Sequence, residues 1–194
     1  MTARIYTKLG DDGSTGLLFG GRVSKADGVV AVVGALDEAV AALGMARAAL
    51  PHHELREQVL QVQRGLFVVG ADVAANPHAR DQLVPRLSLV DAAMVTEVEE
   101  LIDVLVARDP LRPVFVVPGE TLGGAAVDLG RTFVRRAERI LVGMGADPDR
   151  DPGPDRWTLA YLNRVSDLLY VLGRQANEGL DEPVSHERSD DGGP

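Results

Sequence analysis

The sequence predicts an all-α fold, most simply an up-down bundle of about five helices. The 194-residue chain is 45% hydrophobic but only 4% aromatic, so Leu, Val and Ala must build its core, and these residues suit helices. Apolar residues recur at steps of three and four along most of the chain. Short segments rich in Pro, Gly and Asp separate these stretches. We therefore expect a single helical domain over residues 1–178, followed by a disordered acidic tail over residues 179–194.

The first two expected helices cover residues 27–50 and 54–75. Each carries one apolar stripe, and Ser24 or Asp27 can cap the first. In the second helix, Gly65 and Gly70 are expected to permit the close approach of a neighbouring helix.

The remaining helices follow in the same way. Ser88-Leu-Val-Asp91 has the form of a capping box and predicts a helix that runs to about residue 108. Three prolines then exclude a helix over residues 109–120, which should be an extended connector. The fourth helix should begin near Thr121, and the fifth should cover residues 157–177.

Residues 5–27 do not read as a helix. They contain five glycines, the hydroxyl side chains of Thr7, Ser14 and Thr15, and the charges of Lys8 and Lys25. Glycine lets backbone N–H groups turn toward an anion, so the segment could bind phosphate. It is not a Walker A loop, and an ordinary flexible leader remains the alternative.

The expected fourth helix carries a row of arginines. Arg131, Arg135 and Arg139 stack at i, i+4 and i+8, and Glu138 can neutralise only part of their charge. Such a row suggests a missing polyphosphate, because the guanidinium fork matches phosphate oxygens. The alternative is a solvated face with an Arg135–Glu138 pair. The opposite arc is apolar and comprises Leu129, Phe133, Ala137, Ile140 and Met144.

Charge and composition exclude several functions. The net charge is −9, of which residues 178–194 hold −5 (six acids, one base), so −4 remains for residues 1–177. No broad basic surface for nucleic acid is expected. The absence of cysteine excludes disulfides and thiolate sites and fits a cytoplasmic protein. We see no signal-peptide pattern and no stretch expected to span a membrane. The histidines do not show metal-ligand spacing.

Three stretches, in this order, resemble the PduO-type ATP:cob(I)alamin adenosyltransferases. They are Thr7-Lys-Leu-Gly-Asp-Asp-Gly through Arg22-Val-Ser-Lys25; Phe115-Val-Val-Pro-Gly119 leading to residues 131–139; and Tyr161-Leu-Asn-Arg-Val-Ser-Asp167. Leu36-Asp-Glu38 and Gln63-Arg-Gly-Leu-Phe67 are similar to that family as well. The resemblance covers nearly all of the chain before the tail.

The resemblance implies a five-helix bundle that assembles as a homotrimer, with ATP at each subunit interface. It also implies transfer of the 5′-deoxyadenosyl group of ATP to the cobalt of cob(I)alamin, with release of triphosphate. Reduced cobalamin is itself a strong nucleophile, so the protein must mainly orient ATP and neutralise the leaving group. Mg²⁺ would bridge the phosphates, and the product could be delivered to an adenosylcobalamin-dependent enzyme.

The resemblance also assigns residues to the site. The nucleotide would be bound by Thr7, Lys8, Leu9, Gly10, Thr15 and Lys25 and, from the neighbouring subunit, by Arg135, Arg136, Ala137, Glu138, Arg139 and Asn163. Catalytic roles would fall to Arg131, Arg135, Phe115 and Asp37. Of these, Asp37 and Arg131 would pair across subunits. Phe115 would lie against the lower face of the corrin and keep its axial base away, or would instead be a core residue.

Two other classes of function remain open at this point. One is a carrier of cobalamin or nucleotide that has the same fold but no turnover. The other is a helical interaction module whose arginine row meets an acidic partner.

Overall fold

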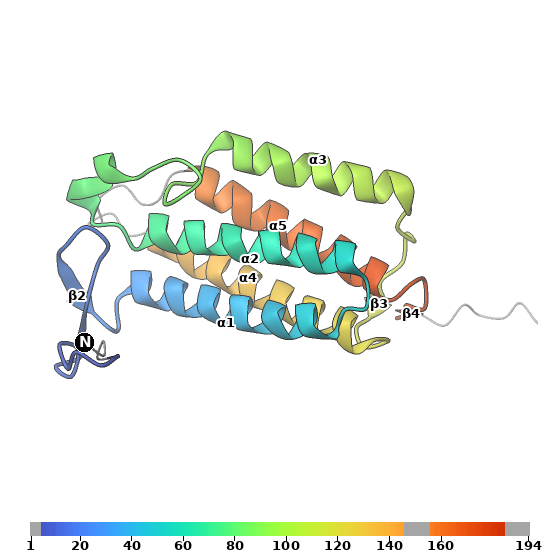
Figure 1. The fold of residues 1–194 in the computed structure, drawn as a ribbon, viewed down its shortest axis with the longest axis horizontal. Coiled ribbons are helices and arrows are strands. Elements are labelled where there is room, and N and C mark those ends of the chain that lie inside the picture. Colours follow the sequence, from blue (N-terminus) through green and yellow to red (C-terminus); the bar gives the residue numbers. More distant parts are fainter. Residues whose placement is uncertain (1–4, 146–155, 185–194) are drawn as a thin grey trace, which may run out of the picture.

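The computed structural model describes residues 5–145 and 156–184. Within these residues the protein is mainly helical, which confirms the predicted class (Figure 1). The helices are α1 (Gly28–Ala49), α2 (His53–Val73), the 3-10 helix η1 (Pro77–Gln82), α3 (Ala92–Arg108), α4 (Leu122–Gly145) and α5 (Arg156–Ala176). The strands are β1 (Ser14–Gly16), β2 (Arg22–Ser24), β3 (Val116–Val117) and β4 (Glu182–Pro183).

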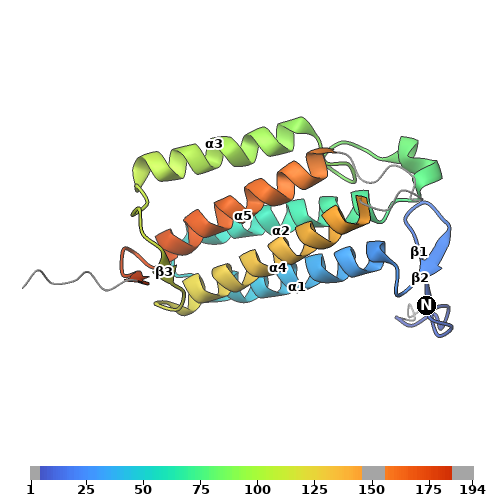
Figure 2. The same cartoon turned by 180° about the vertical axis from the view of Figure 1, so that it is seen from behind.

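The α-helices run alternately in opposite directions along the long axis (Figures 1 and 2). α1 packs most extensively against α4 and also against α2, and α4 packs in turn against α5. α3 lies at one edge and contacts chiefly α5. The core consists of Leu, Val and Ala side chains, as the low aromatic content predicts.

The first helix is more apolar than we expected. By length and composition α1 could cross a membrane, contrary to the expectation that no stretch has this character. In the structure, Val32, Leu36 and Leu43 of α1 are almost completely buried in the core shared with the neighbouring helices. Burial against α4 and α2 accounts for part of this apolar composition, since 39% of the apolar window of α1 is buried.

Glycines let α4 sit close to α1. A Cβ atom on Gly130 would lie 2.7 Å from Leu43 Cδ2, and one on Gly123 would lie 2.9 Å from Leu50 Cδ2. The face of α4 that carries Gly123 and Gly130 is therefore buried in the core. Of the apolar arc seen in the sequence, Ala137 and Met144 are buried, whereas Leu129 is 45% exposed.

Gly65 has a similar role between α2 and α5. A Cβ atom there would lie 1.8 Å from the hydroxyl oxygen of Tyr161, whose side chain is buried. Burial raises the pKa of Tyr161 to about 12, so this hydroxyl stays neutral at physiological pH. Gly70, by contrast, has its nearest neighbour at 3.9 Å, so close packing does not require a glycine there.

A buried aspartate ties together the bundle end that carries the N-terminal segment. Asp72 is fully buried near the end of α2 and accepts hydrogen bonds from Arg80 Nη2 (2.5 Å), Thr158 Oγ1 (2.8 Å) and Val90 N (3.2 Å). It thereby joins α2, η1, the start of α3 and the start of α5.

Two details of the sequence prediction are wrong. Asp91, not Ser88, caps α3, because its Oδ1 accepts the Met94 N–H (2.9 Å). Residues 179–184 were assigned to a disordered tail, yet β4 pairs with β3 and Asp181 is buried. The rest of the expected tail, residues 185–194, lies outside the described residues.

The Gly65 contact gives the first prediction. Gly65→Ala should lower the free energy of unfolding by about 1–3 kcal/mol, because the methyl group overlaps the Tyr161 ring. The matched control is Gly44→Ala in α1, where the nearest atom is 3.5 Å away. It should be neutral or stabilising, since alanine favours a helix by about 1 kcal/mol over glycine. Urea unfolding measures both changes, and equal effects of the two substitutions would contradict this packing.

Candidate active site

The glycine-rich segment folds into a small hairpin, which the sequence analysis did not predict. β1 and β2 pair antiparallel, with Thr15 opposite Val23. Backbone hydrogen bonds from Leu18 N to Ala74 O (2.8 Å) and from Asn76 N to Leu18 O (2.9 Å) attach the hairpin to the end of α2. Asp27 then caps α1 by accepting the Val29 N–H (2.8 Å). The segment is therefore anchored to the bundle at the turn between β1 and β2 and at its junction with α1.

The loop before the hairpin brings the expected nucleotide residues together. Lys25 Nζ donates to Gly10 O (2.8 Å), and Arg22 Nη2 donates to Leu9 O (2.6 Å). Lys8 has a left-handed backbone conformation (φ 62°), which turns the chain at this point. Of the predicted set, Thr7, Lys8, Leu9 and Lys25 are exposed, while Gly10 and Thr15 are half-buried. The loop thus presents two lysines beside exposed backbone.

Asp12 stabilises the turn into β1. Its Oδ1 accepts hydrogen bonds from Ser14 N (2.9 Å) and Ser14 Oγ (2.7 Å), while Arg22 Nε donates to Ser14 Oγ (3.0 Å). The hydrogen bonds from Ser14, and to a smaller extent the charge of Arg22, lower the pKa of Asp12 below its usual value. The carboxylate is therefore ionised throughout the neutral range.

The arginines of α4 do not share one environment. Arg135 and Arg139 are exposed on the outer face, and Arg135 Nη1 lies 3.4 Å from Ser166 Oγ of α5. Arg136 turns toward α1, where it forms an ion pair with Glu38. Glu138 accepts a hydrogen bond from Asn163 Nδ2 (3.2 Å). Ala137 is fully buried, so its side chain cannot contact a ligand on the outer face.

Arg131 and Asp37 do not meet within one chain. Arg131 Nε lies 3.3 Å from Asp128 Oδ1, and its guanidinium stands 5.9 Å from the centre of the Tyr170 ring. Asp37 is exposed on α1, beside a groove of about 300 Å³ lined in part by Leu66 and Phe67. Among the described residues, no ion pair joins the two side chains. Phe67 is 67% exposed, so an apolar surface surrounds Asp37.

Phe115 is 87% exposed, which excludes its role as a core residue in this chain. It directly precedes β3, and its carbonyl oxygen accepts the Val184 N–H (2.8 Å). The β3–β4 pairing holds the backbone of this connector at the opposite end of the bundle from the hairpin (Figure 1).

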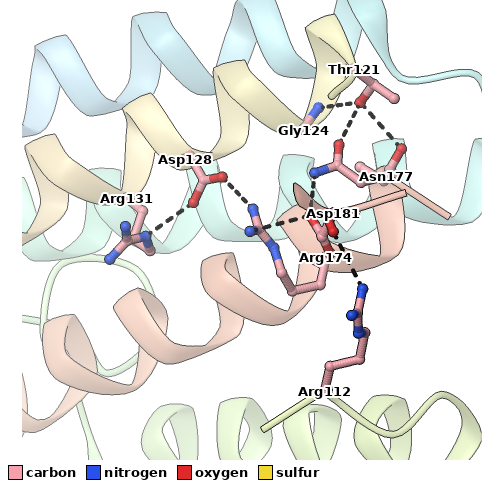
Figure 3. Close-up of polar contacts among 9 residues, drawn as sticks. Arg112, Thr121, Gly124, Asp128, Arg131, Arg174, Asn177 and Asp181 are labelled. Atoms are coloured by element: carbon pink, nitrogen blue, oxygen red, sulfur yellow. Dashed lines mark hydrogen bonds and ion pairs between the residues drawn. The ribbon is translucent and has the colours of Figure 1, made fainter. Parts of the chain in front are cut away.

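A buried ion cluster behind Arg131 was missed by the sequence analysis (Figure 3). It contains Asp128 of α4, Arg174 of α5 and Asp181, and each of these residues is less than 9% exposed. Arg174 bonds to Asp128 and lies 3.3 Å from Asp181 Oδ1. The sequence does place one charged residue in an apolar stretch of each helix, Asp128 in α4 and Arg174 in α5. These residues predict a buried ion pair only when the two helices are known to be neighbours.

Comparison with known proteins shows to which family the chain belongs. The family model for cobalamin adenosyltransferases matches residues 5–176. The chain belongs to the cobalamin adenosyltransferase family. It is 36% identical over 171 residues to a corrinoid adenosyltransferase from Citrobacter freundii (88% of this chain, 93% of the relative). It is 38% identical over 176 residues to one from Mycobacterium tuberculosis (90% of this chain, 89% of the relative).

Solved structures of the family are similar as well. A variant PduO-type ATP:corrinoid adenosyltransferase from Lactobacillus reuteri, complexed with cobalamin and ATP, matches with a TM-score of 0.80 and 27% identity. That match covers 95% of this chain and 97% of the other chain. A second variant of that enzyme, complexed with ATP, matches with a TM-score of 0.78 and 27% identity, covering 93% of this chain and all of the other.

The Asp12 turn gives the second prediction. Ser14→Ala removes the hydroxyl that donates to Asp12, so the pKa of Asp12 should rise toward its usual value. Because the pKa of Asp12 is lowered in the folded state, the stabilisation from its ionised carboxylate is fully present above the usual pKa of Asp. This stabilisation is lost as the pH falls through the lowered pKa. Carboxyl NMR titration of both proteins measures the change. An unchanged pKa in the variant would contradict the assigned cause.

Proposed function

We propose that this chain transfers the 5′-deoxyadenosyl group of ATP to the cobalt of cob(I)alamin and thereby makes adenosylcobalamin and triphosphate. The observation that carries the proposal is that Arg135 and Arg139 are both exposed on α4. They lie within residues 5–176, which match the family model. Neither arginine has a carboxylate partner among the described residues, so both are available to phosphate oxygens.

The reaction needs no nucleophile from the protein. The cobalt of cob(I)alamin attacks C5′ of ATP with its electron pair; the cobalt–carbon bond forms while the C5′–oxygen bond breaks, and that bond pair leaves with the triphosphate. The protein must therefore hold C5′ in line with the cobalt and neutralise the growing negative charge. Arg135, Arg139, Lys8 and Lys25 supply that charge from fixed backbones.

We propose that each site is formed by two subunits of a homotrimer. The supporting observation is that no hydrogen bond or ion pair joins residues 5–26 to the α4 arginines among the described residues of one chain. Asp37 stands unpaired in the described chain, beside an apolar groove on α1 and α2. A neighbouring subunit that covers this groove could bring its Arg131 to Asp37 and its α4 arginines to the loop around Lys8.

Mg²⁺ would accompany ATP. The described residues contain no group of three His, Asp or Glu side chains that could hold a metal ion. The ion would therefore be held mainly by phosphate oxygens and water, which is a common arrangement for Mg²⁺ with nucleotides. We also propose a cytoplasmic location, which the absence of cysteine fits, and release of the product to a cobalamin-dependent enzyme.

Turnover tests the proposed activity and separates it from a carrier. The purified protein, given ATP, Mg²⁺ and chemically reduced cobalamin, should form adenosylcobalamin and triphosphate in equal amounts. Arg135→Ala should lower ATP affinity and kcat/KM at least about tenfold, because a charged hydrogen bond to phosphate is lost. Arg64→Ala, an exposed arginine on α2, is the matched control and should behave as wild type. Cobalamin binding without triphosphate release would contradict the proposal and favour a carrier.

The shared site predicts complementation between variants. Lys8→Ala and Arg135→Ala should each be nearly inactive. Subunits mixed, unfolded and refolded together should recover up to about a quarter of the sites, because some interfaces then join an intact loop to an intact α4. Activity of the mixture is compared with refolded wild type, and no recovery would argue against a site between subunits.

Phe115 should act on the corrin. Because its side chain is 87% exposed, Phe115→Ala should change the free energy of unfolding by less than about 0.5 kcal/mol. ATP affinity should stay the same, while the rate of adenosylation falls. The loss should be largest when the cobalt must first be reduced from cob(II)alamin, since removal of the axial base eases that reduction. Melting temperature, ATP titration and rate together test this, and a joint loss of stability and ATP binding would show that Phe115 packs instead.

A further inference from the structure

The ion cluster behind Arg131 connects two parts of the proposed site. Asp128 uses one carboxylate oxygen for each of two arginines: Oδ1 faces Arg131 Nε at 3.3 Å, and Oδ2 accepts from Arg174 Nη2 (Figure 3). The Tyr170 ring lies near both guanidiniums, 5.9 Å from Arg131 and 5.1 Å from Arg174. Arg131 is thus oriented by its neighbours from α4 and α5 before any partner subunit approaches.

Asp181 balances this cluster from the C-terminal segment. Its Oδ1 lies 3.3 Å from Arg174 Nη1 and accepts a hydrogen bond from Asn177 Nδ2 (2.7 Å). Two arginines and two aspartates give a cluster with no net charge. Without the Asp181 charge, Asp128 alone would have to neutralise both Arg174 and Arg131. Because Arg174 is buried and cannot be hydrated, the Asp128 carboxylate would then interact mainly with Arg174 and less with Arg131.

The same residue fixes the strand that follows Phe115. Asp181 directly precedes β4, in which Glu182 pairs with Val117 and Pro183 pairs with Val116. Val184 N donates to Phe115 O at 2.8 Å, and Arg112 Nη1 donates to Asp181 O at 3.3 Å (Figure 3). The backbone of Phe115 is therefore held by a short strand whose start is anchored in the buried cluster.

We propose that Asp181 is a positioning residue for the adenosyl transfer, which sets the orientation of Arg131 through Arg174 and Asp128 and the place of Phe115 through β4. The inference rests on the proposed function, because only there do Arg131 and Phe115 serve one reaction. Asp181 contacts neither substrate. Its effect lies in the geometry of the cobalamin step, while ATP is held by the hairpin loop and by Arg135 and Arg139.

The test compares two substitutions in adjacent residues of the 194-residue protein, each of which replaces a carboxylate by an amide of the same shape. Asp181→Asn should lower kcat at saturating cobalamin and ATP by at least about tenfold, because small misplacements of catalytic groups have effects of this size. Its KM for ATP should stay within about twofold of wild type. Glu182→Gln removes a charge from the exposed neighbour in β4 and should leave both constants unchanged.

Two further readouts separate positioning from simple stabilisation. With ATP and cob(II)alamin, Asp181→Asn should reduce the fraction of cobalt whose absorption and EPR spectra show loss of the axial base. Adding Phe115→Ala to Asp181→Asn should reduce this fraction little further, because both changes act on the same contact. Arg112→Gln, which loosens β4 from the surface without touching the buried charges, should shift the spectra in the same direction and guards against a failure of Asp181→Asn to fold.

Wild-type kcat and spectra in folded Asp181→Asn would overturn the inference, as would wild-type spectra in Arg112→Gln if Asp181→Asn does not fold. A lower melting temperature with unchanged kcat would show a purely structural role and would overturn it as well. If the wild-type protein itself forms no adenosylcobalamin, the proposed function fails instead, so the two failures are distinguishable.

Discussion

The close packing of α4 on α1 is the constraint on which the proposed site depends. Gly123 and Gly130 leave room for Leu50 and Leu43, so the two backbones approach closely and α4 cannot rotate without a clash. With this face fixed, Arg135 and Arg139 must point outward, while Arg131 turns toward α5 and Arg136 toward Glu38. One helix thus presents arginines in three directions, and only the outward pair is free for an anionic ligand.

The two ends of the bundle have different tasks. At one end, buried Asp72 stabilises the C-terminal end of α2, and backbone hydrogen bonds to Ala74 and Asn76 attach the hairpin there. At the other end, the β3–β4 pair holds Phe115 and is anchored through Asp181. The arginines of α4 lie between these ends. This separation fits a reaction in which a nucleotide and a large planar cofactor approach each other from different directions.

The sequence predicts the local features of this arrangement and misses those that depend on long-range contacts. Periodicity placed all five helices to within a few residues, because each buries one stripe of its own surface. It grouped Leu129 with the apolar arc of α4, although Leu129 is 45% exposed in the structure. The Asp128–Arg174 pair was missed because its partners are 46 residues apart. Likewise, pairing with β3 orders residues that composition alone assigns to a disordered tail.

The most direct test of the account is whether the loop and α4 meet between subunits. The chain has no cysteine, so one can be placed at exposed Asp11 in the loop and another at exposed Val142 on α4 without changing a proposed ligand. A short bismaleimide, added to the doubly substituted protein in the presence of ATP, should give covalent dimers and trimers on a denaturing gel. Cross-linked product that migrates only as a monomer, with both cysteines consumed, would show that one chain forms the site alone and would contradict the account.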